Sequence, residues 1–206
     1  MLDTKARVLI NKPVNVLANL AKTLQLKPDQ ISLLSFGVGI LAGIFLSFKY
    51  DKTALIFLWA SGLLDVVDGQ LARNTNTSSK SGAFLDMILD RMVESMFVLG
   101  MVIANQELAI PVVVFLISVI FNFSTFLSAG ALFANTGIKS MHYDNGLIER
   151  TETFVFLSLS VVLVSFRGQI IWLLNSLIFI TGIIRFVKIY FLLKRSENNN
   201  EYEVAN

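Results

Sequence analysis

Long apolar segments alternate with short polar segments along most of this chain. A helix needs about 20 mostly apolar residues to cross the hydrocarbon core of a bilayer, whereas the strands of a membrane barrel alternate over shorter stretches. The continuous apolar runs therefore predict an all-α membrane protein with six transmembrane helices, of which the fifth is short. These runs cover residues 31–48, 53–71, 82–104, 108–133, 153–166 and 168–192.

The segment before the first apolar run has a different pattern. Pro13 suits the first turn of a helix. Apolar residues then recur at helical spacing opposite polar ones, which predicts an N-terminal amphipathic helix on the membrane surface. The alternative is a cap that packs on the helical bundle. The apolar positions are Leu17, Leu20, Ala21 and Leu24.

Composition supports a single membrane domain at 28–195, between a juxtamembrane segment at 1–27 and a disordered polar tail at 196–206. Hydrophobic residues make up 54% of the chain and charged residues 16%, whereas soluble domains carry about 25% charged residues. The absence of cysteine excludes disulfides and thiolate chemistry, and a net charge of +2 gives no support for nucleic-acid binding. The lack of an internal repeat argues against a transporter built from repeated halves.

Basic residues predict the orientation of the chain. Six spans place both termini on one side of the membrane, and cytoplasmic loops carry an excess of Lys and Arg. Twelve such residues flank the spans on the side of the termini. We therefore expect both termini in the cytoplasm. The opposite side has three: Lys49, Lys52 and Arg167.

Four aspartates interrupt the second and third apolar segments. Asp65 and Asp68 are three residues apart, and Asp86 and Asp90 are four apart, so each pair shares one face of a helix. The connection NTNTSSKS is short and polar, so we expect these two helices to be antiparallel neighbours. Each ionised carboxylate costs about 2.5 kcal/mol or more at the centre of a membrane. Cations must therefore compensate the four carboxylates. A set of carboxylates without Cys or His favours Mg²⁺, Mn²⁺ or Ca²⁺. Four aspartates can hold two such ions.

The aspartates belong to a longer motif with glycines beside them. Those glycines either leave space for a ligand or allow close packing of helices. The motif resembles the signature of the CDP-alcohol phosphotransferase family of membrane enzymes at all eight fixed positions. The stretch KPDQIS is similar to a Pro-Asn-x-x-Thr element of that family, with Asp29 and Ser32 replacing the usual residues. The motif reads Asp65-x2-Asp68-Gly69-x2-Ala72-Arg73-x8-Gly82-x3-Asp86-x3-Asp90.

This resemblance implies an enzyme of phospholipid biosynthesis in a prokaryotic cytoplasmic membrane, with its active site on the cytoplasmic side and a homodimeric assembly. It implies transfer of a phosphatidyl group from a CDP-linked lipid, such as CDP-diacylglycerol, to an alcohol, with release of CMP. By this resemblance, Asp65, Asp68 and Asp86 would bind Mg²⁺ or Mn²⁺ as a pair of ions, and Asp90 would approach the metals and act as general base. The implied donor-binding residues are Asp29, Ser32, Asp68, Gly69, Ala72, Arg73 and Gly82.

The acceptor pocket is expected to involve basic residues in the later spans. Arg185 has strongly apolar neighbours, which favours a functional role over snorkelling to the surface. Arg150 either binds a phosphate or follows the positive-inside rule, and Lys139 is a weaker candidate. Thr153 occupies a position where the family pattern has Arg, and SAGALFAN lacks the positive charges of the inositol-phosphate branches. Glycerol 3-phosphate is therefore the first expectation for the acceptor, and a less charged alcohol remains open.

Two other functions compete with this enzyme. A divalent-cation transporter or channel would use the same aspartates and carry metal without nucleotide. Alternatively, the aspartates would be purely structural. The complete eight-position motif, with Arg73 and Gly82 in place, favours the enzyme over both alternatives.

Overall fold

The computed structural model describes residues 2–135, 148 and 150–204, with side chains for 12–132, 148 and 150–195. All regular structure in these residues is helical, which confirms the predicted all-α class. Each predicted span coincides with one of the helices from α2 to α7. The elements are α1 (Leu2–Thr23), α2 (Pro28–Ser47), α3 (Asp51–Asn74), α4 (Lys80–Ala104), η1 (Gln106–Leu108), α5 (Ala109–Asn135), α6 (Arg150–Val162), η2 (Val164–Phe166) and α7 (Arg167–Val204).

Length and composition identify four membrane-spanning helices in the described part of the chain. They lie at Pro28–Ser47, Asp51–Asn74, Gln106–Leu132 and Val164–Arg195. The remaining two predicted spans, in α4 and α6, do not meet these criteria of length and composition, each for its own reason. Acidic and basic side chains interrupt the apolar surface of α4, and α6 has 13 residues, fewer than the hydrocarbon core requires.

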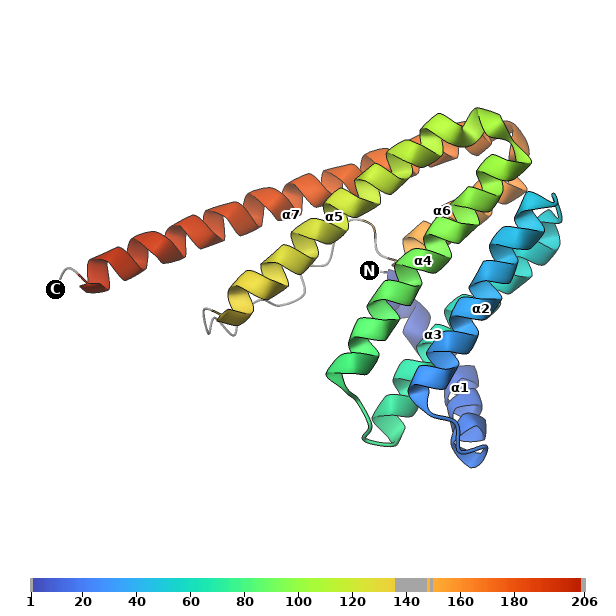
Figure 1. Cartoon of the computed structure of the whole chain (residues 1–206), viewed down its shortest axis with the longest axis horizontal. Coiled ribbons are helices and arrows are strands. Elements are labelled where there is room, and N and C mark those ends of the chain that lie inside the picture. The colour runs from blue at the N-terminus through green and yellow to red at the C-terminus, as the bar shows by residue number, and fades with distance from the viewer. Residues whose placement is uncertain (1, 136–147, 149, 205–206) are drawn as a thin grey trace.

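Helix α2 lies at the centre of the N-terminal half and packs against both α3 and α4. Direct backbone contacts between α3 and α4 are few in the described residues, so the expectation that these two helices are neighbours is corrected. In the other half, α7 packs along α5 and α6, and α6 also touches α3. The α5–α7 pair lies near α4 at one end and diverges from it towards the other end, as Figure 1 shows.

One apolar core connects helices α2 to α7. Its largest fully buried side chains come from all six of these helices, which ties the two halves of the bundle together. Because lipid tails are as apolar as these side chains, close van der Waals packing is what holds them together within the membrane. They include Leu46, Leu58, Phe97, Phe115, Leu157 and Leu174.

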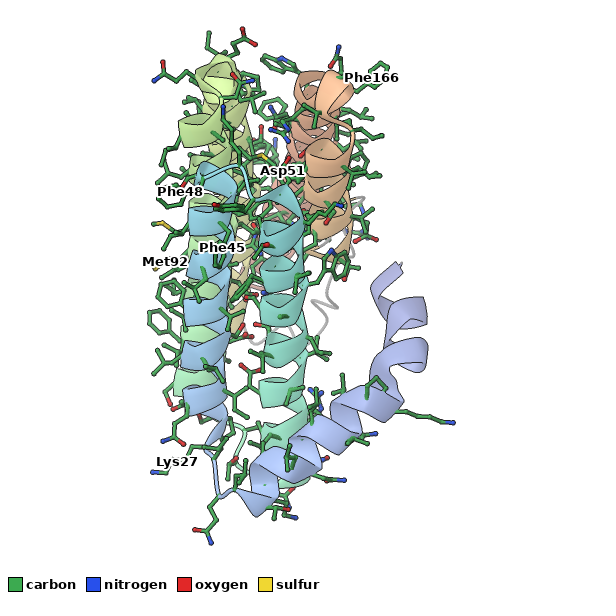
Figure 2. The ribbon with its side chains drawn as sticks, turned by 90° about the vertical axis from the view of Figure 1, so that its right-hand side faces the viewer. Lys27, Phe45, Phe48, Asp51, Met92 and Phe166 are labelled. Atoms are coloured by element: carbon green, nitrogen blue, oxygen red, sulfur yellow. The ribbon has the colours of Figure 1, made fainter. Side chains whose placement is uncertain are left out.

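Helix α1 crosses the ends of α2 and α3 near Lys27 (Figure 2). Its buried side chains pack with residues of α2 and α3. This face of the helix therefore fits the alternative of a cap that packs on the helical bundle. Leu20 and Leu24, expected on the apolar face, are 55% and 62% exposed. With Val16 they form a second apolar row that faces away from the other helices. The buried row consists of Val14, Ala18 and Ala21.

Two boundary predictions differ from the structure. Pro13 lies inside α1, which begins at Leu2, because a proline kinks a helix without always ending it. The expected disordered tail is also corrected, since α7 continues to Val204. No Gly or Pro occurs between 196 and 204, and each further residue adds one backbone hydrogen bond to an existing helix.

An arginine joins three segments at the end of the bundle opposite Lys27. Arg167 donates from Nε to the carbonyl oxygen of Ser160 (2.9 Å) and from Nη2 to that of Val161 (3.2 Å). The same Nη2 lies 3.3 Å from Asp51 Oδ2. The guanidinium thereby satisfies the last carbonyls of α6 and ties them to the start of α3.

Glycines set the close approach of α2 and α4. A Cβ atom on Gly100 would clash with the backbone carbonyl of Gly43, and one on Gly43 would clash with the backbone of Met96. Backbone atoms cannot move aside as a flexible side chain can, so these two helices depend on both glycines for their spacing.

We expect Gly100→Ala to destabilise the folded protein by about 1–3 kcal/mol, as overpacked cores do. Thermal unfolding of the purified protein in detergent measures this change. Gly37→Ala is the matched control on α2, because nothing lies within 4 Å of a Cβ at that position. Equal unfolding temperatures for the two variants would contradict the close α2–α4 contact.

Candidate active site

Three of the four aspartates converge between α3 and α4. One carboxylate oxygen each from Asp65, Asp68 and Asp86 lies within 4.8 Å of the others. The helical spacing that places Asp65 and Asp68 on one face of α3 therefore aims them at the facing side of α4. Such a set of carboxylate oxygens, without Cys or His, suits a hard divalent cation.

The hydrogen bonds of this cluster also fit a bound cation. Ser32 on α2 donates from Oγ to Asp68 Oδ2 at 2.5 Å, which fixes the orientation of a carboxylate that is only 5% exposed. In contrast, Asp86 Oδ1 is buried without a hydrogen-bond partner among the described residues. Buried polar atoms are normally partnered, so this oxygen fits the role of a metal ligand.

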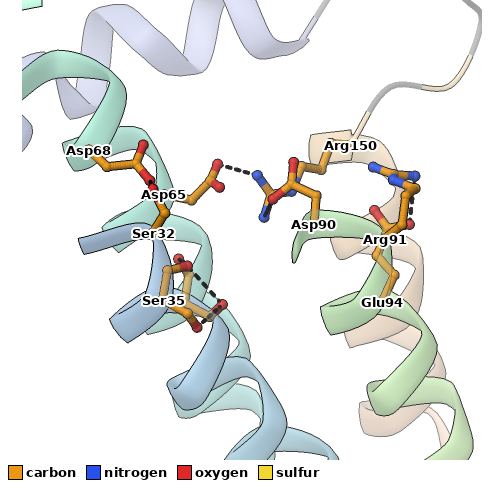
Figure 3. A network of polar contacts seen from close by, with 9 residues as sticks. Ser32, Ser35, Asp65, Asp68, Asp90, Arg91, Glu94 and Arg150 are labelled. Carbon is orange, nitrogen blue, oxygen red and sulfur yellow. Dashed lines mark hydrogen bonds and ion pairs between the residues drawn. The ribbon is translucent and has the colours of Figure 1, made fainter. Parts of the chain in front are cut away.

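Asp90 is placed differently from the other three aspartates. Its Oδ1 lies 2.7 Å from Nη2 of Arg150, the first residue of α6. Nη1 of the same guanidinium forms an ion pair with Asp65, so Arg150 bridges α3 and α4, as Figure 3 shows. The sequence predicted Arg150 at the acceptor and Asp90 at the metals, and the structure brings both residues to the aspartate cluster.

A pocket beside the cluster contains every residue that the sequence analysis assigned to the CDP-linked donor. The N-terminal ends of α2 and α4 and the C-terminal end of α3 form its walls. The pocket also contains residues that the sequence analysis did not single out, chiefly from the connection between α3 and α4. Its lining is Pro28, Asp29, Ser32, Asp68, Gly69, Ala72, Arg73, Thr77, Ser78, Ser79, Gly82, Ala83 and Asp86.

Local capping brings two helix starts to this pocket. Pro28 is the first residue of α2, a position where its missing N–H is not needed. Ser79 caps α4 and accepts a hydrogen bond from the Gly82 backbone N–H at 3.0 Å. Unpaired N–H groups and the positive end of the helix dipole favour anions at such positions.

The two motif glycines have different roles in the lining. A Cβ on Gly69 would meet only the guanidinium of Arg73, at 3.5 Å, so packing alone does not require glycine there. A Cβ on Gly82 would lie 3.1 Å from Ser79 Oγ and 3.4 Å from Asp29 Oδ1. Gly69 thus leaves space in the pocket, whereas Gly82 permits a close approach of its walls.

The other two acceptor candidates do not join this cluster in the described contacts. Arg185 on α7 donates to Asn122 Oδ1 on α5 at 2.9 Å and lies over the ring of Phe126. Lys139 lies outside the described residues. Arg185 is therefore placed between α5 and α7, and its link to the site stays a prediction.

A fifth acidic residue, missed by the sequence analysis, lies next to the aspartates. Glu94 on α4 is 1% exposed and forms an ion pair with Arg91 at 2.7 Å. Arg91 in turn lies over the ring of Phe123 on α5. The available signal was spacing, because Asp86, Asp90 and Glu94 recur every four residues along one face of α4.

Comparison with known proteins decides the family. The family model for CDP-alcohol phosphatidyltransferases matches residues 25–189. The chain belongs to the CDP-alcohol phosphatidyltransferase family. It is therefore an enzyme that transfers substituted phosphate groups, and the sequence-based expectation of this class is confirmed. The cation-transporter alternative, which used the aspartates for metal flux, has no support from this match.

Two curated relatives illustrate the range of similarity. The inner membrane protein YnjF of Escherichia coli is 31% identical over 175 residues, which cover 81% of this chain and 84% of YnjF. The archaetidylinositol phosphate synthase of Pyrococcus horikoshii is 28% identical over 102 residues, covering 50% of this chain and 54% of that enzyme. This second similarity is confined to about half of each protein.

Solved structures share the fold. The phosphatidylinositol phosphate synthase PgsA1 of Mycobacterium tuberculosis, with CDP-DAG bound, has a TM-score of 0.74 and 19% sequence identity, and the match covers 86% of this chain and 93% of that one. A second PgsA1 structure, in complex with manganese and citrate, has the same TM-score and 21% identity. At this level of identity the similarity establishes the helical architecture.

We expect Ser32→Ala to weaken Mn²⁺ binding by about 10- to 100-fold, since Asp68 loses the hydroxyl that orients it. Isothermal titration of the purified protein measures the affinity. Ser35→Ala is the matched control one turn along α2, because Ser35 bonds to Ser61 and to no carboxylate. An equal loss of Mn²⁺ affinity in both variants would contradict the role of the Ser32–Asp68 hydrogen bond.

Proposed function

We propose that the protein transfers a phosphatidyl group from a CDP-linked lipid to a phosphorylated alcohol and releases CMP. The observation that carries this proposal is the convergence of Asp65, Asp68 and Asp86 at the edge of a pocket lined by the donor motif. Membership of the CDP-alcohol phosphatidyltransferase family supports the same reaction. The PgsA1 structure with CDP-DAG bound supports a CDP-lipid as donor.

The walls of the pocket suit the diphosphate of such a donor. The starts of α2 and α4 both present backbone N–H groups and positive dipole ends to it. Arg73, at the last turn of α3, adds a guanidinium from the third wall. Mg²⁺ or Mn²⁺ bound by the aspartates, two ions in our proposal, would neutralise charge on the diphosphate and on the departing CMP.

Asp90 is proposed as the general base that removes the proton from the acceptor hydroxyl. It lies on the same face of α4 as Asp86, one turn further from the donor pocket. In this structure its Oδ1 lies 2.7 Å from Arg150 Nη2, which holds the carboxylate beside the metal ligands. A carboxylate within hydrogen-bond reach of the acceptor hydroxyl can take its proton.

The acceptor proposed first is glycerol 3-phosphate. Arg150 and Arg185 offer guanidinium groups suited to a phosphate, and Lys139 is retained as a third candidate. Thr153 in place of an arginine argues against inositol phosphate. The names of the Pyrococcus relative and of PgsA1 favour inositol phosphate, which is therefore the second candidate.

The membrane arrangement follows the same proposal. In this arrangement the segments from α2 to α7 cross the membrane six times, α6 doing so together with η2, and α4 carries its charged residues towards the active site. The exposed row Val16, Leu20 and Leu24 of α1 lies in the membrane surface beside them. Both termini and the active site face the cytoplasm of a prokaryotic cell, and two copies form a homodimer.

The purified protein with Mg²⁺ or Mn²⁺ and CDP-diacylglycerol should release CMP when the correct alcohol is added. Glycerol 3-phosphate, inositol phosphate, inositol and serine form the test panel. Asp86→Asn should abolish the release because it removes a metal ligand, while Asp51→Asn, at the opposite end of α3, should retain it. Stimulation by inositol phosphate alone would reject the first acceptor, and no release with any alcohol would reject the reaction.

Asp90→Asn should lower kcat by about 10²–10⁴-fold, the usual contribution of a general base, and leave the KM for CDP-diacylglycerol nearly unchanged. Steady-state CMP release measures both constants. Unfolding temperature serves as the control for folding. An Asp90→Asn protein with full kcat would remove Asp90 from the role of base.

A further inference from the structure

Glu94 is a buried acid for which the proposed reaction has no role. It is 1% exposed, and its ion pair with Arg91 (2.7 Å) lacks hydrogen-bond geometry. Neither carboxylate oxygen therefore accepts a hydrogen bond from the described residues. Arg91 compensates the charge, but both carboxylate oxygens are still available as hydrogen-bond acceptors, so Glu94 can accept a second guanidinium.

Arg150 has a matching unpaired group. Its Nη1 contacts Asp65 and its Nη2 forms an ion pair with Asp90, but Nη2 and Nε are both buried without a hydrogen-bond partner in the described residues. Glu94 attracts the Arg150 guanidinium electrostatically, in addition to the attraction from the two aspartates. Figure 3 shows the Arg150 guanidinium between Asp65 and Asp90, with the Arg91–Glu94 pair beyond Asp90.

Geometry allows Arg150 to change partners. Asp90 and Glu94 are four residues apart on α4, and side chains at this spacing begin about 5–6 Å apart. Arg150 begins α6, and its long side chain can move by one turn of α4 through rotamer changes alone. The ring of Phe154, 5.3 Å from the guanidinium carbon, provides an apolar surface beside this path.

The bridging position conflicts with metal binding. The Arg150 guanidinium forms an ion pair with Asp65, one of the three aspartates that converge as candidate metal ligands. A guanidinium on one oxygen of Asp65 weakens the binding of a divalent cation to the same carboxylate, because the two positive charges repel each other and share one negative charge. Metal binding at Asp65 therefore depends on where the arginine goes.

We propose that Glu94 is a positioning residue that takes over the Arg150 guanidinium and so frees Asp65 for metal and Asp90 for the acceptor hydroxyl. This inference rests on the proposed function. In the Glu94 position, the guanidinium lies one turn of α4 beyond Asp90, where it can contact a phosphate on the acceptor. Loading of the metal and formation of the acceptor site are then coupled through one arginine.

A purely structural role for Glu94 makes a different prediction. If Glu94 served only to pair with Arg91, its loss would lower stability without changing metal affinity. If the negative charge of Glu94 acted on the bound cation only through long-range attraction, its loss would lower metal affinity equally with or without Arg150. Only the proposed exchange of partners makes the effect of Glu94 depend on Arg150.

The test is Mn²⁺ binding to the purified full chain, measured by isothermal titration and by the electron spin resonance of free Mn²⁺. Glu94→Gln should weaken binding about tenfold, within the usual range of coupling between sites. Arg150→Gln should strengthen binding, because the competitor is gone. In the Arg150→Gln background, Glu94→Gln should change the affinity by less than about twofold.

Two further variants complete the experiment. Glu94→Asp keeps the charge but shortens the reach, so it should also weaken Mn²⁺ binding; this variant replaces Glu94→Gln if the latter does not fold. Asp51→Asn, which removes the ion pair to Arg167, should leave the affinity unchanged.

The outcomes separate this inference from the proposed function. Wild-type protein that binds no Mn²⁺ would overturn the metal site and the inference together. Mn²⁺ binding by the wild type that is unaltered in both Glu94 variants would overturn the inference alone. An equal effect of Glu94→Gln with and without Arg150 would also overturn it, because long-range attraction would then suffice.

Discussion

The structure depends on how five acidic side chains are compensated inside a bundle of apolar helices. Asp65, Asp68, Asp86, Asp90 and Glu94 all lie between α3, α4 and α6. Their repulsion and desolvation oppose folding unless cations and hydrogen-bond donors surround them. Serine on α2, arginine on α4 and α6, and the metal ions of the proposed reaction supply this compensation. The same charges that make the bundle costly to assemble are therefore the ones available for phosphoryl chemistry.

Packing around α2 creates the space in which these charges meet. Small residues let α2 approach both neighbours closely: Gly43 faces Gly100 on α4, and Ser35 exchanges hydrogen bonds with Ser61 on α3. Because α2 holds α3 and α4 apart, their carboxylates face a pocket instead of each other's backbone. An apolar core beneath these polar side chains holds the carboxylates of the proposed metal site in position.

Much of the site could be predicted because its residues are close in sequence and lie on regular helices. Helical spacing placed the aspartates on common faces, and the residues that the motif resemblance assigned to the donor line one pocket. Other features depend on residues far apart along the chain. The pairing of Arg150 with Asp65 joins residues 85 positions apart, and periodicity carries no information about such a contact. The row that α1 buries against α2 and α3 also could not be told from the sequence, since both of its apolar rows have helical spacing.

By itself, the sequence determined the helical class, the position of each helix and the chemical nature of the acidic cluster. These features follow from local patterns: apolar runs long enough for a membrane, capping residues at helix starts and carboxylates at helical spacing. Only the tertiary structure decided that α2 separates α3 from α4, that Arg150 bridges Asp65 and Asp90, and that Glu94 lies buried beside them. The physical reason is that long-range packing selects one arrangement among many that satisfy the same local patterns, and the partner of each buried charge is fixed by that arrangement.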